Sequence, residues 1–444
     1  MDISEKDRGK LIKIIKKNIT YLGHIVNISG NELTIKLKDN GYNISVILDK
    51  DTKYELLSEK KEIGKTYKLE IKQNPALPSI CLVATGGTIG THVDYKSGGV
   101  NMSRTPEEIL STVPELLEIV NIKKIVPVIQ KASEDLCYKD WQAIAKAVYE
   151  QLIDDEIDGV IISHGTDTLT ITGTALSFML SNFNKPVLMV GAQRSPDRAS
   201  FDGAMNLVCA AHFIKEKIPG VYTSMHGSIS DDFCHIIRAT KCRKMHTSRR
   251  DAFRAVNDTA LAKVYQNGKI EYLKDKKLFW EIQKEKPHLD ISFSDTVALL
   301  KIYPNFNPEV IDWYISKGYK GLILEGTGLG LVPTDDSTNK LTDKTKDCLP
   351  YLEKVSKKGI IIIMTTQCLF GRVNGNVYSN LRNLTKAGVN YLDHHDMLPE
   401  VACIKLGVAL ARFKTKEDII KYMSKDISGE ITKKEVPADF DGFE

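Results

Sequence analysis

The stretch ICLVATGGTIG, residues 80–90, decides the fold of this chain. Its first half, Ile80–Ala84, is apolar at every position, which is typical of a strand covered on both faces of a sheet. Its second half, Thr85–Gly90, is a turn of glycine and hydroxyl residues. The same order recurs where Gly159–Ser163 leads into HGTDT at 164–168, so we expect several buried strands that each end in a polar turn.

Segments with apolar residues at helical spacing alternate with these buried strands. Two of them are Tyr138–Leu152 and Ile171–Ser181. Alternating strands and helices predict an α/β fold with a mostly parallel sheet and helices on both of its faces. The strands expected in this body are Ile80–Thr85, Gly159–Ser163, Pro186–Gly191, Gly220–Ser224, Thr296–Ile302, Gly321–Leu324 and Gly359–Thr365.

The chain divides into three compositional regions. Residues 1–73 predict a small β-barrel domain, because short alternating runs are separated by turn residues. Residues 79–285 and 292–425 predict two α/β domains, and the two prolines in 73–79 predict a linker before them. The end of the chain, 431–444, is expected to be poorly ordered. The strands expected in the first region are Tyr21–Val26, Leu33–Lys38, Tyr42–Leu48 and Thr66–Ile71.

The composition is that of a folded soluble protein. Of the 444 residues, 42% are hydrophobic and 27% are charged, which excludes a disordered chain or a coiled coil. The longest apolar runs are far shorter than a membrane span, and the first residues do not resemble an export signal. Eight cysteines without a CxxC pair indicate free thiols in a reducing compartment, so we expect a cytoplasmic protein.

The net charge of +4 arises in the first 72 residues, which hold 15 basic and 11 acidic side chains. Four of the lysines crowd a short stretch. They are Lys10, Lys13, Lys16 and Lys17. This pattern indicates a solvated face, and weak contact with a polyanion is the alternative.

The polar turns form the candidate site. Ligands in open α/β sheets bind at the carboxyl ends of strands, where these turns lie. The pair Gly86-Gly87 lets backbone approach a ligand and can aim N–H groups at an oxyanion. Asp167 places a carboxylate beside the hydroxyl of Thr166. The alternative is that each turn merely connects a strand to a helix, but two hydroxyl-rich turns together favour a shared site.

Other motifs point to no second site. Gly64-Lys65-Thr66 ends like a phosphate-binding loop, but Glu59 stands where that loop needs glycine. GTGLG at 326–330 misses the spacing of a dinucleotide-binding loop and predicts close packing. His394-His395-Asp396 has no accompanying ligands, so we expect a surface loop and no metal site. Lys241–Arg250 predicts a solvated loop, with the exception of Lys244.

Two motifs carry a family resemblance. TGGTIG at 85–90 and HGTDT at 164–168 together resemble the signatures of the L-asparaginase/glutaminase family. ASED at 132–135 resembles its substrate-clamping loop, and GAQRSPD at 191–197 resembles the turn after its next strand. The resemblance implies an asparaginase-like two-domain parallel-sheet body preceded by the small N-terminal β-barrel.

One branch of that family is especially similar. The N-terminal β unit and KMHTSRRDAF at 244–253 resemble the D subunits of archaeal glutamyl-tRNA(Gln) amidotransferases. GTGLG at 326–330 and GRVNGNVYSN at 371–380 are also similar to that group.

The resemblance implies catalytic roles for four residues. Thr88 would be the first nucleophile, and Thr166, Asp167 and Lys244 would form a second hydroxyl–carboxylate–amine group. A threonine hydroxyl is a weak nucleophile and needs a nearby base. A lysine fills that role only when its pKa is lowered, and a carboxylate can orient it.

Substrate-binding roles are also implied. Ser133 would hold the α-carboxylate of the substrate, and Glu134 and Asp167 would hold its α-ammonium group. Tyr95 would be the tyrosine of the mobile loop after the first motif. Free glutamine is a zwitterion, and a site that selects it meets both charges. The alternatives are that Ser133 caps the following helix and that Tyr95 is an exposed loop aromatic.

The implied function is that of a glutaminase subunit in a tRNA-dependent amidotransferase. Ammonia from glutamine would convert Glu-tRNA(Gln) to Gln-tRNA(Gln) on a partner, the E subunit, which uses ATP and Mg. This chain would need no cofactor, would contact tRNA mainly through the partner, and would form the homodimer core of a heterotetramer. A free L-asparaginase/glutaminase is the first alternative. An inactive tRNA-binding scaffold is the second, and the intact set of Thr88, Thr166, Asp167 and Lys244 argues against it.

Overall fold

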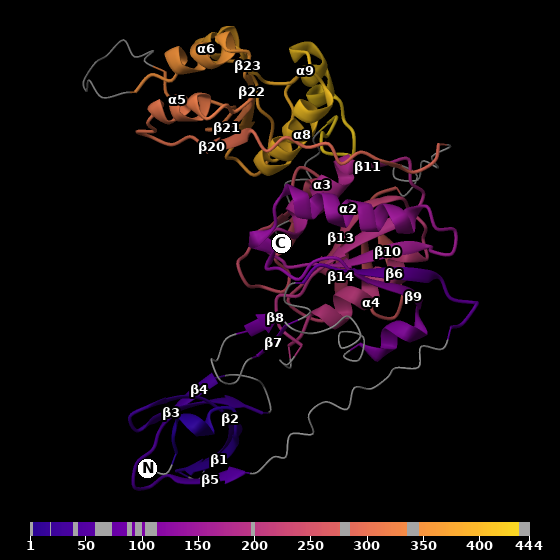
Figure 1. Cartoon of the computed structure of the whole chain (residues 1–444), viewed down its shortest axis with the longest axis vertical. Coiled ribbons are helices and arrows are strands. Elements are labelled where there is room, and N and C mark those ends of the chain that lie inside the picture. The colour runs from indigo at the N-terminus through magenta and orange to yellow at the C-terminus, as the bar shows by residue number, and fades with distance from the viewer. Residues whose placement is uncertain are drawn as a thin grey trace.

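The computed structural model describes residues 3–17, 19–38, 43–57, 73–86, 91–93, 100–102, 113–196, 200–275, 285–334 and 346–434. Figure 1 shows three groups of elements along the longest axis: the strands β1–β5, the elements from β6 to β19, and the elements from β20 to α9. Each group contains its own main sheet.

The first group is a five-stranded antiparallel sheet in the order β4-β3-β2-β1-β5. Its strands are β1 (Leu11–Lys16), β2 (Ile19–Ser29), β3 (Glu32–Leu37), β4 (Asn43–Ile47) and β5 (Lys53–Leu57). No ladder joins β4 to β5 among the described residues, so the sheet is open there and the predicted small barrel is not confirmed. The apolar residues of alternating positions form its core, which includes Ile12, Ile14, Ile25, Leu33 and Ile35.

The sequence predicted three of these strands and missed two. The predicted runs that begin at 21, 33 and 42 correspond to β2, β3 and β4. The fourth predicted strand, Thr66–Ile71, lies outside the described residues. Strand β1 was missed because its lysines indicate a solvated face, whereas Lys13 lies there between the buried Ile12 and Ile14.

The second group contains an eight-stranded sheet in the order β18-β17-β14-β13-β12-β10-β6-β9. The five strands from β13 to β9 are parallel, which confirms the predicted parallel sheet. Three antiparallel strands, β14, β17 and β18, extend it beyond the prediction. The bounds are β6 Ser79–Ala84, β9 Asn121–Pro127, β10 Gly159–Ser163, β12 Pro186–Val190, β13 Gly220–His226, β14 Phe233–Arg238, β17 Ala262–Tyr265 and β18 Ile270–Tyr272.

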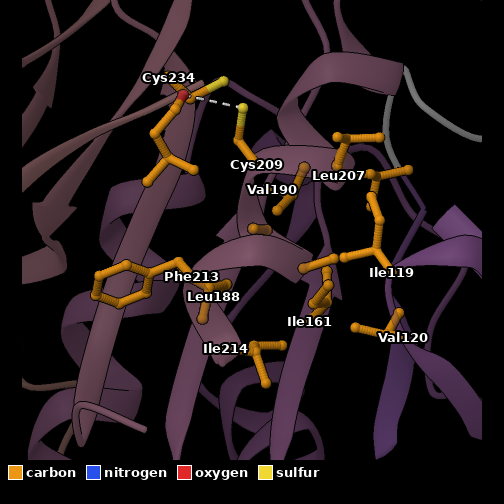
Figure 2. Close-up of a cluster of buried hydrophobic side chains, with 14 of the residues drawn as sticks. Ile119, Val120, Ile161, Leu188, Val190, Leu207, Cys209, Phe213, Ile214 and Cys234 are labelled. Carbon is orange, nitrogen blue, oxygen red and sulfur yellow. Dashed lines mark hydrogen bonds between the residues drawn. The ribbon is translucent and has the colours of Figure 1, made fainter. Parts of the chain in front are cut away.

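Helices cover both faces of this sheet. On one face, α2 (Tyr138–Leu152) and α3 (Leu169–Met179) pack over residues such as Val160 and Ile162. On the other face, α4 (Gly203–Ile214) packs over Ile161 and its neighbours, as Figure 2 shows for Leu188, Phe213 and Ile214. Burial on both faces explains why the strands are continuously apolar. The two helices predicted from spacing are α2, with the predicted bounds, and α3, two residues earlier than predicted.

Among the residues that the structure describes, the third group is a four-stranded parallel sheet in the order β20-β21-β22-β23 with five helices. The GTGLG loop follows β21, and the Cβ of a residue replacing Gly330 would lie 2.5 Å from the side chain of Met364, so the predicted close packing is confirmed. The bounds are β20 Val297–Lys301, α5 Glu309–Ser316, β21 Gly321–Gly326, α6 Leu349–Lys357, β22 Ile361–Thr366, α7 Ser379–Lys386, β23 Val389–Asn390, α8 Pro399–Arg412 and α9 Lys416–Ser424.

Helix α8 joins the two α/β groups by packing against α3.

Short elements complete the described chain. The remaining strands form two-stranded pairs: β7 (Thr91–Val93) with β8 (Val100–Met102), β11 (Leu180–Ser181) with β19 (His288–Leu289), and β15 (Cys242–Lys244) with β16 (Phe253–Ala255). Single turns of 3-10 helix are η1 Glu5–Asp7, η3 Pro114–Glu118, η4 Ser133–Asp135 and η5 Ala239–Lys241.

The predicted surface loop at 394–396 is wrong, and the predicted solvated loop at 241–250 is wrong at its start, although residues 246–249 are exposed. His395 and Asp396 are both buried. The His395 ring contacts the Met364 carbonyl and the Met397 N–H. The Asp396 carboxylate forms an ion pair of 2.8 Å. Its partner is Lys241, which is also buried although it belongs to a cationic stretch. Each charge looks solvated in the sequence because its partner lies 155 residues away.

The tail is ordered further than predicted. The N–H of Thr432 donates a hydrogen bond of 2.9 Å to Asp396, and residues 431–434 belong to the described chain. Residues 435–444 lie outside it. Over the described residues, no helix is long and apolar enough to span a membrane, and no cluster of three potential metal ligands is present. The eight cysteines are all free in the described chain, as predicted.

Candidate active site

The first signature motif enters the site through Thr85 and Gly86. The Thr85 hydroxyl donates a hydrogen bond of 2.9 Å to the Ser163 carbonyl, which ties the end of β6 to the end of β10. Gly86 has a φ of +95°, and a Cβ at this position would lie 2.6 Å from the Lys131 carbonyl. Only glycine fits this contact without strain. Thr88 and Tyr95 lie outside the described residues.

The clamp loop docks on the second signature motif. Ser133 is 3% exposed, and the Cβ of a residue replacing Gly165 would come within 2.7 Å of its Cβ. Thr168 donates a hydrogen bond of 2.6 Å to the Ser133 carbonyl. Ser133 does not cap α2, since that position belongs to Cys137. The neighbouring Glu134 is exposed.

Three predicted catalytic residues meet at one point. The ammonium group of Lys244 donates hydrogen bonds of 2.9 Å to the Thr166 hydroxyl and 2.7 Å to Asp167. The Lys244 side chain is 13% exposed and that of Asp167 is 63% exposed, while Thr166 is buried. The three side chains therefore form one hydrogen-bonded group, in which the hydroxyl and the amine are largely buried and the carboxylate is exposed to solvent.

Gln193 is a fourth contact of this group that the sequence reasoning missed. The Thr166 hydroxyl, which accepts from Lys244, donates its proton to the amide oxygen of Gln193 at 3.3 Å. Gly191 makes the approach possible, because a Cβ there would lie 2.9 Å from the Thr166 methyl group. The amide nitrogen of Gln193 is buried and has no hydrogen-bond partner among the described residues. The GAQR turn was the available signal, since it follows the neighbouring strand β12.

A buried carboxylate supports the Gln193 turn. Asp202, just before α4, accepts hydrogen bonds from the backbone N–H groups of Gln193 at 3.0 Å and Arg194 at 2.9 Å. Burial raises the pKa of Asp202. Asn206 donates a hydrogen bond of 3.0 Å to the Gly191 carbonyl from the next turn of the helix. Nothing in the sequence marks Asp202, because its two shorter hydrogen bonds come from backbone groups and only the longer one, of 3.4 Å, comes from the Asn206 side chain.

Asn206 continues this support towards the loop that carries Lys244. Its amide oxygen lies 2.7 Å from the His226 ring, and the other ring nitrogen lies 3.1 Å from Asp231. Arg250, six residues after Lys244, donates a hydrogen bond of 2.6 Å to the same carboxylate. The turn beside Thr166 and the Lys244 loop are thus linked by side chains behind the site.

The arrangement suits acyl-transfer chemistry. One hydroxyl oxygen contacts an amine that can exchange a proton with it, and a carboxylate fixes that amine. The strands β6, β10 and β12 are parallel neighbours, so the described parts of the three turns that follow them lie at the same carboxyl edge of the sheet.

Comparison with known families agrees with this geometry. Residues 79–278 match the family described as "Asparaginase, N-terminal", and residues 296–423 match the "Glutaminase/Asparaginase C-terminal domain". Among solved structures, the thermostable L-asparaginase from Thermococcus kodakarensis superposes with a TM-score of 0.70 at 27% identity, covering 80% of this chain and 100% of that one. L-asparaginase I from Vibrio cholerae superposes with a TM-score of 0.66, also at 27% identity, covering 80% of this chain and 99% of that one.

Two curated relatives are similar over nearly the whole chain. The D subunit of glutamyl-tRNA(Gln) amidotransferase from Thermococcus kodakarensis is 42% identical over 433 residues, 96% of this chain and 94% of that protein. The protein of the same name from Methanococcus maripaludis is 40% identical over 429 residues, 96% of this chain and 98% of that protein. A match of this extent includes most of the region before residue 79, which the two asparaginase domains do not cover. The chain therefore belongs to the asparaginase/glutaminase family and, within it, to the D subunits of glutamyl-tRNA(Gln) amidotransferases.

Proposed function

We propose that the chain is the glutaminase subunit of a tRNA-dependent amidotransferase. It hydrolyses glutamine at a threonine-based site and supplies ammonia for the conversion of Glu-tRNA(Gln) to Gln-tRNA(Gln). The similarity to amidotransferase D subunits over 96% of the chain carries this proposal, because it includes the N-terminal β unit that precedes the asparaginase domains. The assembled group of Thr166, Asp167 and Lys244 supports the chemistry.

Two hydroxyl groups share the reaction. The Thr88 oxygen attacks the side-chain carbonyl of glutamine and its hydroxyl proton passes to the nitrogen, so that the carbon–nitrogen bond breaks and the nitrogen leaves as ammonia. Water then cleaves the ester and releases glutamate. The Thr166 hydroxyl and the Lys244 amine lie 2.9 Å apart, a distance at which a proton can pass between them. Asp167, at 2.7 Å, keeps the amine in place.

Substrate recognition uses the residues around that group. Ser133 faces Gly165 from the clamp loop and holds the α-carboxylate of glutamine. Glu134 and Asp167 are both open to solvent and hold the α-ammonium group. Tyr95 completes the site as the loop tyrosine. A carboxylate pair beside a hydroxyl meets both charges of a free amino acid.

Partners supply the remaining steps. The E subunit binds Glu-tRNA(Gln) and activates its carboxylate with ATP and Mg, and this chain contributes a homodimer core to a heterotetramer. The curated relatives are named as one subunit of an amidotransferase, which supports the assembly with other subunits. The sequence contains no recognisable ATP loop, which fits this division of tasks.

Substrate preference tests the proposal. The purified chain, together with the partner subunit, ATP, Mg and Glu-tRNA(Gln), is incubated with glutamine or asparagine, and ammonia is measured with Thr88→Ala as the control. We expect release from glutamine to depend on Thr88 and to exceed release from asparagine. Rapid asparagine hydrolysis by the chain alone would identify a free asparaginase, and full activity of Thr88→Ala would remove the nucleophile assignment.

A further inference from the structure

Lys244 is held by a strand outside the main sheet. Strand β15 pairs only with β16, and this pair is separate from the eight-stranded sheet among the described residues. Thr166, in contrast, follows β10 in the middle of that sheet. The hydrogen-bond ladder that fixes Thr166 therefore does not fix Lys244, and other contacts set the distance between them.

A buried ion pair lies three residues before Lys244. The Lys241 ammonium group lies 2.8 Å from the Asp396 carboxylate, and the two side chains are 2% and 0% exposed. Asp396 belongs to the C-terminal α/β group, just before α8. A buried ion pair contributes little stability compared with a well-packed apolar pair of similar size, because both charges lose their hydration. Stability alone is thus a poor explanation for it.

Further contacts hold the same hairpin against α8. Arg243 lies 3.4 Å from Glu400 in the first turn of that helix. Asn257, just after β16, donates a hydrogen bond of 3.0 Å to the Asp396 carbonyl. The β15–β16 hairpin is therefore attached to the start of α8 on both sides of Lys244.

The tail reinforces this attachment. The Thr432 hydroxyl donates a hydrogen bond of 2.8 Å to the Asn257 carbonyl, and its backbone N–H donates to Asp396. The Asp396 carboxylate thus contacts the hairpin through one oxygen and the tail through the other. Such an arrangement fixes the carboxylate, and through Lys241 it fixes the start of β15.

We propose that Lys241 and Asp396 are positioning residues, through which the C-terminal α/β group sets the place of the Lys244 amine relative to Thr166. The inference rests on the proposed role of Lys244 in glutamine hydrolysis. The C-terminal α/β group would then contribute to catalysis in the α/β group before it. Without the Lys241–Asp396 pair, the β15–β16 hairpin keeps its fold, but the Lys244 amine no longer lies within hydrogen-bond distance of the Thr166 hydroxyl.

Replacement of the pair by apolar residues tests the proposal. In Lys241→Met with Asp396→Leu, no unpaired charge is left and only the Thr432 N–H loses its acceptor, so the protein folds with a melting temperature slightly below that of the wild type. We expect kcat to fall about 10- to 100-fold, because misplacement of a catalytic group by about 1 Å has an effect of this size. KM changes less than about 3-fold, since the substrate contacts are unaffected.

The matched control is a second ion pair between the same two groups. Arg412, at the other end of α8, lies 2.6 Å from Asp290 and does not contact β15. Arg412→Met with Asp290→Leu lowers the melting temperature and leaves kcat unchanged. If the Lys241 variant does not fold, Asp396→Asn, which keeps the shape of the side chain, serves instead and loses kcat about 10-fold.

The outcomes separate two failures. A folded variant of the Lys241–Asp396 pair with the kcat of the wild type would overturn the positioning role. A wild-type chain that releases no ammonia from glutamine, alone or with its partner and charged tRNA, would overturn the proposed function instead.

Discussion

Lys244 and Thr166 are 78 residues apart in the chain, and the Lys244 ammonium group donates a hydrogen bond of 2.9 Å to the Thr166 hydroxyl. The two residues reach this contact from different supports, a central strand and a hairpin outside the sheet. Their distance therefore depends on how several parts of the chain pack together, and each of those parts yields a prediction.

A substitution that removes the Thr166 hydroxyl but keeps the shape of the side chain tests its role in catalysis. We expect Thr166→Val to lower kcat for glutamine by about 10²- to 10⁴-fold, the usual contribution of a proton-transfer group. Thr166→Ser keeps the hydroxyl and serves as the control, with a loss of less than about 10-fold. Equal kcat values for the two variants would contradict a role of the hydroxyl. The melting temperature of each shows that the fold is intact.

The Asp202 carboxylate holds the turn that carries Gln193. Asp202→Asn leaves one of the two backbone N–H groups facing an NH₂ group, so we expect the free energy of unfolding to fall by about 1–3 kcal/mol. We also expect kcat to fall, because Gln193 contacts Thr166. Denaturant titration and steady-state kinetics measure the two effects. The exposed Asp155→Asn is the control and changes neither; a normal kcat in Asp202→Asn would separate the turn from catalysis.

The contact between Gly165 and Ser133 tests the clamp loop. A Cβ at position 165 would lie 2.7 Å from the Ser133 Cβ, so Gly165→Ala displaces Ser133. We expect KM for glutamine to rise about 10-fold, equivalent to ~1.4 kcal/mol of binding. Gly318→Ala is the control, since it has a φ of +79° but open space around it and lies far along the chain from the site. It lowers stability without a change in KM. An unchanged KM in Gly165→Ala would remove Ser133 from substrate binding.

Buried histidines predict acid lability. Burial lowers the pKa of His164 and of His395 from the ordinary 6.5 to about 4. Below pH 6.5 these histidines bind protons in the unfolded chain but not in the folded chain. Stability is therefore lost as the pH falls from 6.5 to about 4. We expect each histidine to lower the free energy of unfolding by ~1.4 kcal/mol per pH unit in this window.

The His395 ring shows the physical reason. One ring nitrogen accepts a hydrogen bond from the Met397 N–H, and the other donates to the Met364 carbonyl. A second proton would have to bind the accepting nitrogen and would break its hydrogen bond. His395→Gln reduces the slope of stability against pH, measured by denaturant titration at several pH values, and the exposed His288→Gln does not. An unchanged slope in His395→Gln would show that this ring takes up a proton without loss of stability.

The sequence predicted the parts of the fold that depend on local pattern. Strands such as β10 and helix α2 are continuous or periodic in their apolar residues, and their predicted bounds agree with the structure. The antiparallel strands β14, β17 and β18 were missed because their short runs are interrupted by polar residues. Strand β1 was missed because its lysines were interpreted without their buried neighbours.

The site residues that belong to the family motifs could be predicted from the sequence. Thr166, Asp167 and Lys244 follow from the family resemblance, and the structure brings them together. Gln193 and Asp202 were missed because they act on a neighbouring hydroxyl and on backbone N–H groups, which leave no spacing pattern. The Lys241–Asp396 pair was misinterpreted because a buried charge is recognised only when its distant partner is known.

Ammonia release tests the central claim most directly. The purified chain is incubated with glutamine alone, and then with the partner subunit, ATP, Mg and Glu-tRNA(Gln), while ammonia and Gln-tRNA(Gln) are measured. The proposed function predicts efficient glutamine hydrolysis only in the assembled reaction, with ammonia transferred to the tRNA-bound glutamate. Rapid hydrolysis by the chain alone, unchanged by the partner and the charged tRNA, would contradict it.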